Sequence, residues 1–130
     1  MKGGDMMRLN HDCVRKLLLY LEENLECVDD LDLLNVKIDG FSQDDLLYSA
    51  MKLNDAKYIK ASILIDIEGK ADITISCITW DGHKFLDTIR DNQVWSNTKK
   101  ILSKVSSASI TFASNVASQV LTNIINQQIG

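Results

Sequence analysis

The clearest repeat of apolar side chains lies near the N-terminus, where they recur every three or four residues. The apolar positions of this stripe are Val14, Leu17, Leu18, Leu21 and Leu25. The spacing predicts an amphipathic helix, because such steps return to one face of an α-helix. Asn10 is a good N-cap, and Asp12 places a carboxylate in the first turn, where the helix dipole favours it. We therefore expect a core-forming helix.

A second helical pattern begins after Ser42 and extends from Gln43 to about Asp55. Ser42 is a typical N-cap, and Asp45 three residues later approximates a capping box. The apolar positions are Leu46, Leu47, Ala50, Met51 and Leu53. They cover slightly more than one face, so most of this helix is expected to be buried. The residues expected to face outward are Gln43, Asp44, Tyr48, Ser49, Lys52, Asn54 and Asp55.

Two β-rich runs, Ile63–Ile67 and Ile73–Ile78, flank a turn at residues 68–70. Both runs alternate with period two and contain β-branched residues. This pattern predicts a hairpin with one face on the core, and Gly69 supplies the turn.

The chain becomes helical again after Thr79, the expected N-cap. Phe85, Leu86 and Ile89 form the predicted buried stripe, with Trp80 packing at its entrance. Gly82, early in this helix, indicates a close approach to another backbone. We expect His83 to be a surface residue.

The segment between Cys27 and Phe41 is ambiguous. Residues 29–34 predict one short helix, and residues 35–38 a short strand that ends at Asp39-Gly40. Three acidic residues there, Asp29, Asp30 and Asp32, raise the possibility of a metal site. A calcium loop also needs oxygen ligands at alternating positions and a terminal bidentate glutamate, which the segment lacks. A solvated helix start is the expected interpretation.

The helix–hairpin–helix order is typical of the second half of a winged helix-turn-helix domain. The predicted fold class is therefore α+β. We expect a winged-helix domain over residues 1–90 and a C-terminal helical extension over residues 91–130.

The extension differs in character from the rest of the chain. No charged side chain follows Lys104, over the 26 residues from Val105 to Gly130. Such a segment could pack against a second copy, lie against another protein or a membrane surface, or form a polar, weakly ordered tail. Polar residues interrupt any apolar run long enough to span a membrane. We favour a homodimer, because exposed apolar clusters usually mark interfaces. The expected oligomerisation residues are Trp95, Ile101, Leu102, Val105, Phe112, Val116, Val120 and Ile124.

The distribution of charge bears on DNA binding. The net charge is −4, with −4 in residues 1–42, −2 in residues 43–90 and +2 in residues 91–130. A nonspecific DNA-coating protein would be basic throughout. Asp44 and Asp45, in the half of the helix that DNA readers insert into the major groove, repel phosphates. The candidate DNA-binding residues are Gln43, Tyr48, Ser49, Lys52, Lys57, Lys60 and Lys70.

The sequence offers no pattern for catalysis, for a metal or for a cofactor. Cys13, Cys27 and Cys77 are dispersed, and no secretory signal is recognised, so we expect reduced thiols in a cytoplasmic protein. A Cys–His pair would need Cys13 or Cys77 to meet His11 or His83 in space. No nucleotide-binding, hydrolase or metalloprotease motif is present. We expect a protein that is not an enzyme and has no catalytic residues.

Five stretches of the chain form recognisable motifs: Leu9–Arg15, Phe41–Asp45 with Tyr48, Leu53–Ile59, Ile78–Asp87 and Val94-Trp95. Together they resemble a family of small proteins of unknown function, found mainly in prophages and mobile elements of Gram-positive bacteria. The resemblance covers nearly the whole chain and implies a winged-helix-like core and a phage context. It implies no activity and no functional residues.

Two hypotheses about function follow. The first is a dimeric DNA-binding transcription regulator of a phage or mobile element, whose symmetry would match a palindromic site. The second is a protein-binding module that inhibits or redirects a host or phage nucleic-acid-binding protein and contacts no DNA. The acidic residues that would suit such a basic target are Asp29, Asp30, Asp32, Asp44 and Asp45.

Overall fold

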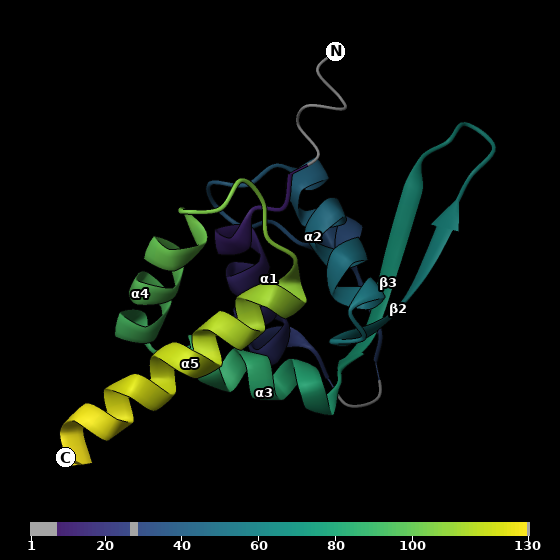
Figure 1. Ribbon diagram of the computed structural model, residues 1–130. Coiled ribbons are helices and arrows are strands. Elements are labelled where there is room, and N and C mark those ends of the chain that lie inside the picture. Colours follow the sequence, from purple (N-terminus) through teal and green to yellow (C-terminus); the bar gives the residue numbers. More distant parts are fainter. Residues whose placement is uncertain (1–7, 27–28, 130) are drawn as a thin grey trace.

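The fold joins helices to a small antiparallel sheet, so the α+β class is confirmed (Figure 1). The computed structural model describes residues 8–26 and 29–129. In chain order the elements are α1 (His11–Asn24), β1 (Leu31–Asp32), the 3-10 turn η2 (Leu33–Asn35), α2 (Gln43–Asp55), β2 (Ile59–Ile65), β3 (Ala71–Ile78), α3 (Trp80–Ile89), α4 (Asn92–Leu102) and α5 (Ile110–Ile129). The strand order in the sheet is β1-β3-β2.

Helix α1 lies at the centre of the core, as its apolar stripe predicts. Val14, Leu17, Leu18 and Leu21 are all buried. The predicted cap is confirmed, because the Asn10 side chain accepts a hydrogen bond from the backbone N–H of Cys13. The same core includes α4 and α5 residues, so side chains from both sides of the expected boundary at residue 90 pack together.

The expected order of a helix and then a strand in residues 29–38 is wrong. Leu31 and Asp32 form β1 and pair with Ile75 and Thr74 of β3. The 3-10 turn η2 follows at once, because the Asp32 side chain caps it by accepting from the N–H of Leu34. Cys27 and Val28 lie outside the described residues.

The hairpin is confirmed, although β2 begins four residues earlier than predicted. Lys57, at φ 66°, ends α2 and turns the chain directly into the sheet. At the other end Asp66 Oδ1 accepts from the N–H groups of Glu68 and Lys70, and Gly69 has φ 85°. This turn fixes the register.

Only part of the hairpin rests on the core, contrary to expectation. Ile73 is fully buried and Ile63 is half-buried, whereas Ile65 is 69% exposed and Ile67 is fully exposed. The distal end of the hairpin runs past the helical body (Figure 1).

Helix α3 begins at the predicted cap, where the Thr79 hydroxyl accepts from the N–H of Gly82. Phe85, Leu86 and Ile89 are buried, as expected. The expected close approach at Gly82 is also confirmed, since a Cβ added there would lie 2.0 Å from the carbonyl oxygen of Tyr58. The expected packing of Trp80 is wrong, because this first helical residue is 78% exposed.

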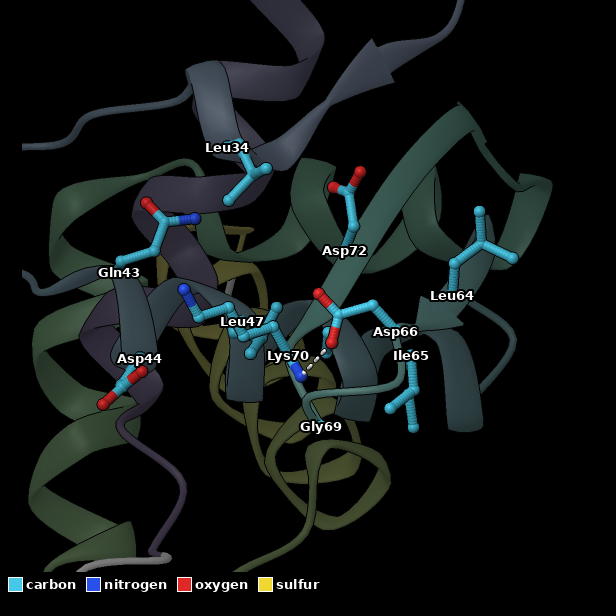
Figure 2. Close-up of a pocket in the computed structure, with 11 residues that line it drawn as sticks. Leu34, Gln43, Asp44, Leu47, Leu64, Ile65, Asp66, Gly69, Lys70 and Asp72 are labelled. Carbon is cyan, nitrogen blue, oxygen red and sulfur yellow. Dashed lines mark hydrogen bonds between the residues drawn. The ribbon is translucent and has the colours of Figure 1, made fainter.

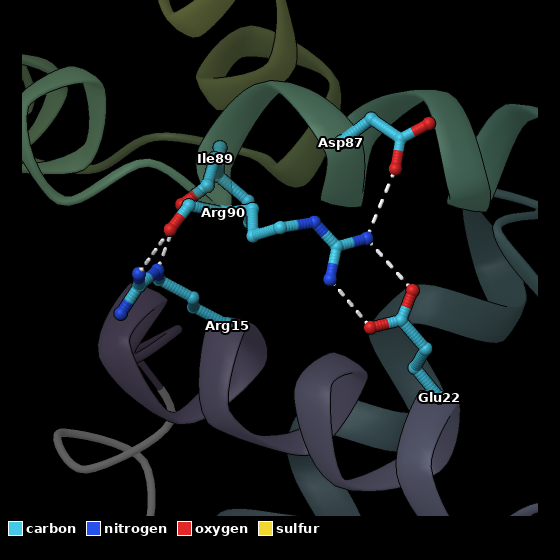
Figure 3. Close-up of polar contacts among 5 residues, drawn as sticks. All are labelled: Arg15, Glu22, Asp87, Ile89 and Arg90. Atoms are coloured by element: carbon cyan, nitrogen blue, oxygen red, sulfur yellow. Dashed lines mark hydrogen bonds and ion pairs between the residues drawn. The ribbon is translucent and has the colours of Figure 1, made fainter.

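Two arginines tie α1 to the end of α3 (Figure 3). Arg15 is buried and donates to the carbonyl oxygens of Ile89 and Arg90, each at 2.8 Å. Arg90 Nη2 donates to Glu22 at 2.7 Å and to Asp87 at 3.0 Å. The Arg90 hydrogen bonds lower the pKa of Glu22. Arg15 thus satisfies helix-end carbonyls that would otherwise lack donors.

A second polar group joins α1 to α4. Asp12 accepts from Trp95 Nε1 at 2.9 Å and forms an ion pair with Lys99 at 3.1 Å. Burial opposes ionisation of this carboxyl, but these two donors outweigh it and lower the pKa of Asp12. Helix α4 is therefore fixed on the body rather than projecting from it.

Helix α5 is divided between the body and solvent. Ile110, Ala113, Ala117 and Val120 are buried, and α5 packs on α3 and α4. Its C-terminal half extends past the body (Figure 1), where Ile125 and Ile129 are exposed.

Candidate functional site

A cleft of about 730 Å³ opens between α2 and the distal part of the hairpin (Figure 2). We call it the hairpin cleft. Its lining residues are Leu34, Gln43, Asp44, Leu47, Leu64, Ile65, Asp66, Gly69, Lys70, Ala71 and Asp72. They come from η2, from the first turns of α2, and from both strands and the turn of the hairpin. The volume falls in the range of small-ligand pockets.

The α2 wall is held in place by the capping box that the sequence predicts. Ser42 accepts from the N–H of Asp45, and the Asp45 carboxylate accepts from the N–H of Ser42. Gln43 then donates to the carbonyl oxygen of Leu33 at 3.1 Å, which joins α2 to η2. This arrangement leaves Asp44 exposed at the cleft and Leu47 half-buried in its wall.

The opposite wall is apolar and largely open to solvent. Leu64 is 67% exposed and Ile65 is 69% exposed, and Leu34 on η2 is also exposed. The Lys70 side chain extends across Leu47 toward Gln43 and Asp44 (Figure 2). The walls therefore present aliphatic carbon, with a single lysine crossing between them.

Three carboxylates surround this apolar surface, from Asp44, Asp66 and Asp72, against the one cation of Lys70. A hydrogen bond with the Asp32 side chain, desolvation and the nearby Asp32 charge together raise the pKa of Asp72. Asp72 Oδ1 is buried and has no hydrogen-bond partner. The cleft thus has a negative rim, with three carboxylates and one cation among its lining residues.

The candidate DNA-binding residues on α2 are not a free polar surface. Ser49 is buried, so its expected outward position is wrong; it is hydrogen-bonded to the Cys13 thiol. Gln43 is bonded to Leu33, and Lys52 pairs with Asp55 at 3.6 Å and lies 5.3 Å from the Tyr48 ring centroid.

The three other candidates, Lys57, Lys60 and Lys70, are exposed lysines after α2 and along the hairpin. Lys57 follows α2, Lys60 lies near the base of β2, and Lys70 lies in the cleft. Of the three, Lys70 lines the hairpin cleft together with Gln43 of α2. Asp44 and Asp45 are both exposed at the start of α2, and Asp44 lines the cleft.

The expected oligomerisation residues fall into two groups. Trp95, Leu102 and Val120 are buried in the chain's own core, so their side chains are not available to a partner. The others are exposed or half-buried: Ile101, Val105, Phe112, Val116 and Ile124. The small residues Ala113 and Ala117 pack against the protein's own helices.

Two of the three thiols and both imidazoles lie within the described residues. Burial raises the pKa of the Cys13 thiol, and burial also lowers the pKa of His11, whose Nε2 is bonded to the carbonyl oxygen of Ala108. Cys77 and His83 line the same small hollow of about 230 Å³, without a hydrogen bond joining them. Among residues 8–26 and 29–129, no three potential ligands gather around a metal position.

Sequence reasoning missed the cleft itself. The sequence feature that could have indicated it is the apolar alternation of the first strand, which continues through Ile65 to Ile67. Alternation identifies the face of a strand, but not how far along it a helix packs.

These features define a small α+β domain with an apolar, acid-rimmed cleft beside a projecting hairpin. Residues 8–109 match the family described as "Hypothetical protein (DUF2513)", and the chain belongs to that family. An "Uncharacterized protein" of Haemophilus influenzae is 30% identical over 125 residues, which are 95% of this chain and 99% of the relative. No solved structure matches the chain.

Neither match shows that the protein comes from a prophage or from a Gram-positive bacterium, so both expectations stay predictions. Within the described residues, no helix has the length and apolar character needed to span a membrane.

Proposed function

We propose that this protein is a non-enzymatic, protein-binding module with a winged-helix core, and that the hairpin cleft holds part of its partner. The chain order α1-β1-η2-α2-β2-β3 and the strand order β1-β3-β2 support the winged-helix assignment. In that fold η2 takes the place of the second helix, α2 that of the recognition helix, and the hairpin that of the wing.

One observation supports protein binding most strongly: the exposed apolar surface beside the cleft. Leu34, Leu64, Ile65 and Ile67 are all exposed on η2 and the hairpin. Exposed aliphatic clusters of this kind usually mark an interaction surface, because water-exposed apolar area is costly and is removed by a partner. An aliphatic surface suits a protein segment better than a nucleic acid.

DNA binding is the second candidate, favoured by the winged-helix chain order and by exposed Lys57, Lys60 and Lys70. Against it stand the carboxylates of Asp44 and Asp45 at the start of α2, where a recognition helix approaches phosphates. Ser49 is buried, and Lys52 already has an acidic partner. We therefore place the transcription-regulator hypothesis second.

Photo-crosslinking from the cleft distinguishes the two candidates. A diazirine analogue of leucine at position 64 keeps the size and apolar character of the exposed Leu64 side chain. We expect irradiation in cells to give a discrete protein adduct. The control carries the same analogue at Trp80, which is exposed on α3 and does not line the cleft. We expect it to give no such adduct.

If nuclease treatment removed the crosslinked partner from the protein, the partner would be a nucleic acid. That result would overturn the protein-binding proposal and favour DNA binding. Equal protein adducts from positions 64 and 80 would show that the cleft has no special part in binding.

We also propose that the C-terminal half of α5 pairs with its counterpart in a second copy, which gives a cytoplasmic homodimer. Leu121, Ile124, Ile125 and Ile129 continue the apolar face beyond the body. No charge on α5 opposes the approach of two identical helices. The proposed dimer surface is thus smaller than the sequence pattern indicates, because Trp95, Leu102 and Val120 are buried in the protein's own core.

Light scattering of the full-length chain tests this pairing. We expect wild type to have twice the chain mass and the double variant Ile125→Lys with Ile129→Lys to have the single-chain mass, because two buried charges per helix would need desolvation. Asn123→Lys adds a charge to the opposite side of α5 and should remain dimeric. A single-chain mass for wild type would contradict the proposal.

A further inference from the structure

We infer that the hairpin cleft selects a segment of a partner protein in which lysine or arginine flanks a short run of aliphatic residues. This rests on the proposed protein-binding function and adds the chemistry of the partner. The inference comes from two features found together: an aliphatic floor and a rim with excess carboxylate.

The aliphatic side chains on the two walls, which we call the floor, favour a partner segment with apolar side chains. Leu47 of α2 faces Ile65 of the hairpin across the cleft, and Leu34 closes one end (Figure 2). A segment placed between these walls would cover aliphatic surface on both sides, whereas a contact with the hairpin alone would cover only one. About 730 Å³ accommodates a few side chains, not a whole domain.

The carboxylates of the rim favour a partner segment that carries positive charge. Asp44 lies on the α2 side, and Asp66 and Asp72 lie on the hairpin side. A cation placed among them gains attraction from both walls. Lys70 offsets one of the three carboxylates, which leaves the rim acidic.

The same charges argue against two other occupants. A second copy's α5 is apolar but has no cation to place among the carboxylates. A nucleic acid would bring phosphates to an acidic rim and would leave the aliphatic floor without an apolar partner. A basic, aliphatic protein segment satisfies both features.

Selection from a random peptide library on the full-length, immobilised protein tests the inference. We expect enriched peptides to combine two or more aliphatic residues with flanking lysine or arginine. Ile65→Ser should weaken their binding by about tenfold or more through lost apolar burial. The double variant Asp44→Asn with Asp66→Asn should weaken it by about fivefold, as expected for two solvent-exposed ion pairs. Asp81→Asn, an exposed change on α3 outside the hairpin cleft, should leave it unchanged.

Each other outcome overturns a different statement. Enriched aliphatic peptides that are acidic or uncharged, and that still depend on Ile65, would overturn the basic specificity and leave the proposed function standing. Peptides that bind Ile65→Ser as tightly as wild type, or no enrichment at all, would overturn the cleft as a protein-binding site. Unchanged folding of each variant is verified by its circular dichroism spectrum.

Discussion

Replacing Gly82 with alanine is expected to reduce the free energy of unfolding by at least about 3 kcal/mol. The added Cβ would lie 2.0 Å from the carbonyl oxygen of Tyr58 and 2.8 Å from a methyl group of Ile78. The first neighbour is backbone and cannot turn aside. It is held because Tyr58 O accepts from the N–H of Thr79, which is also the cap of α3. The helix must therefore move away from the sheet.

Urea unfolding followed by circular dichroism measures this loss. Gly40→Ala is the matched control, because a Cβ at Gly40 meets nothing within 4 Å and only the left-handed φ of 91° opposes it. That strain costs about 1 kcal/mol. Equal losses at the two glycines would show that the approach of α3 to Tyr58 is not as close as described.

Replacing Arg15 with methionine should cost about 3 kcal/mol of unfolding free energy. Methionine keeps much of the apolar stem but removes the donors to Ile89 O, Arg90 O and Asn92 Oδ1. It also removes the cation that lies 5.8 Å from the centroid of the Trp95 ring. The carbonyl groups at the end of α3 would be left without these donors in a region where Arg15 itself is buried.

Lys16→Met serves as the control in the same unfolding assay, since Lys16 is the exposed neighbour of Arg15 on α1. We expect a change within about 0.5 kcal/mol there. If Arg15→Met were equally mild, water would have to replace all three hydrogen bonds at the α3–α4 junction.

The helices of the body could be predicted because their signals are local. The stripe of α1, the capping box of Ser42 and Asp45, and the Thr79 cap all lie within a few residues of the element they define. Gly82 was identified for the same reason: glycine early in a helix has few causes other than a close neighbour.

Features that depend on distant elements were predicted less well. Asp32 could have begun a helix, but pairing with Thr74 of β3 makes it a strand residue and a cap for η2. The pattern of α2 alone places Ser49 on the outward face, but in the structure Ser49 is buried against Cys13 of α1. Ala113 and Ala117 are buried where α5 packs on α3 and α4, and their spacing in the sequence does not specify those neighbours.

The hairpin cleft could not be located from the sequence, because its existence depends on where α2 ceases to cover the sheet. Ile63 and Ile65 have the same place in the alternating pattern, but the first is half-buried and the second is mostly exposed. The composition of the cleft was visible only in part, as the acidic residues at the start of α2.

The most direct test of the cleft as the binding surface is photo-crosslinking from position 64 in a chain that also carries Leu34→Ser. Leu34 is exposed on η2 at one end of the cleft, so serine there should leave folding intact. We predict that the protein adduct seen with the unmodified cleft is lost or strongly reduced. An adduct of undiminished yield would contradict the account, because the partner would then contact the hairpin without entering the cleft.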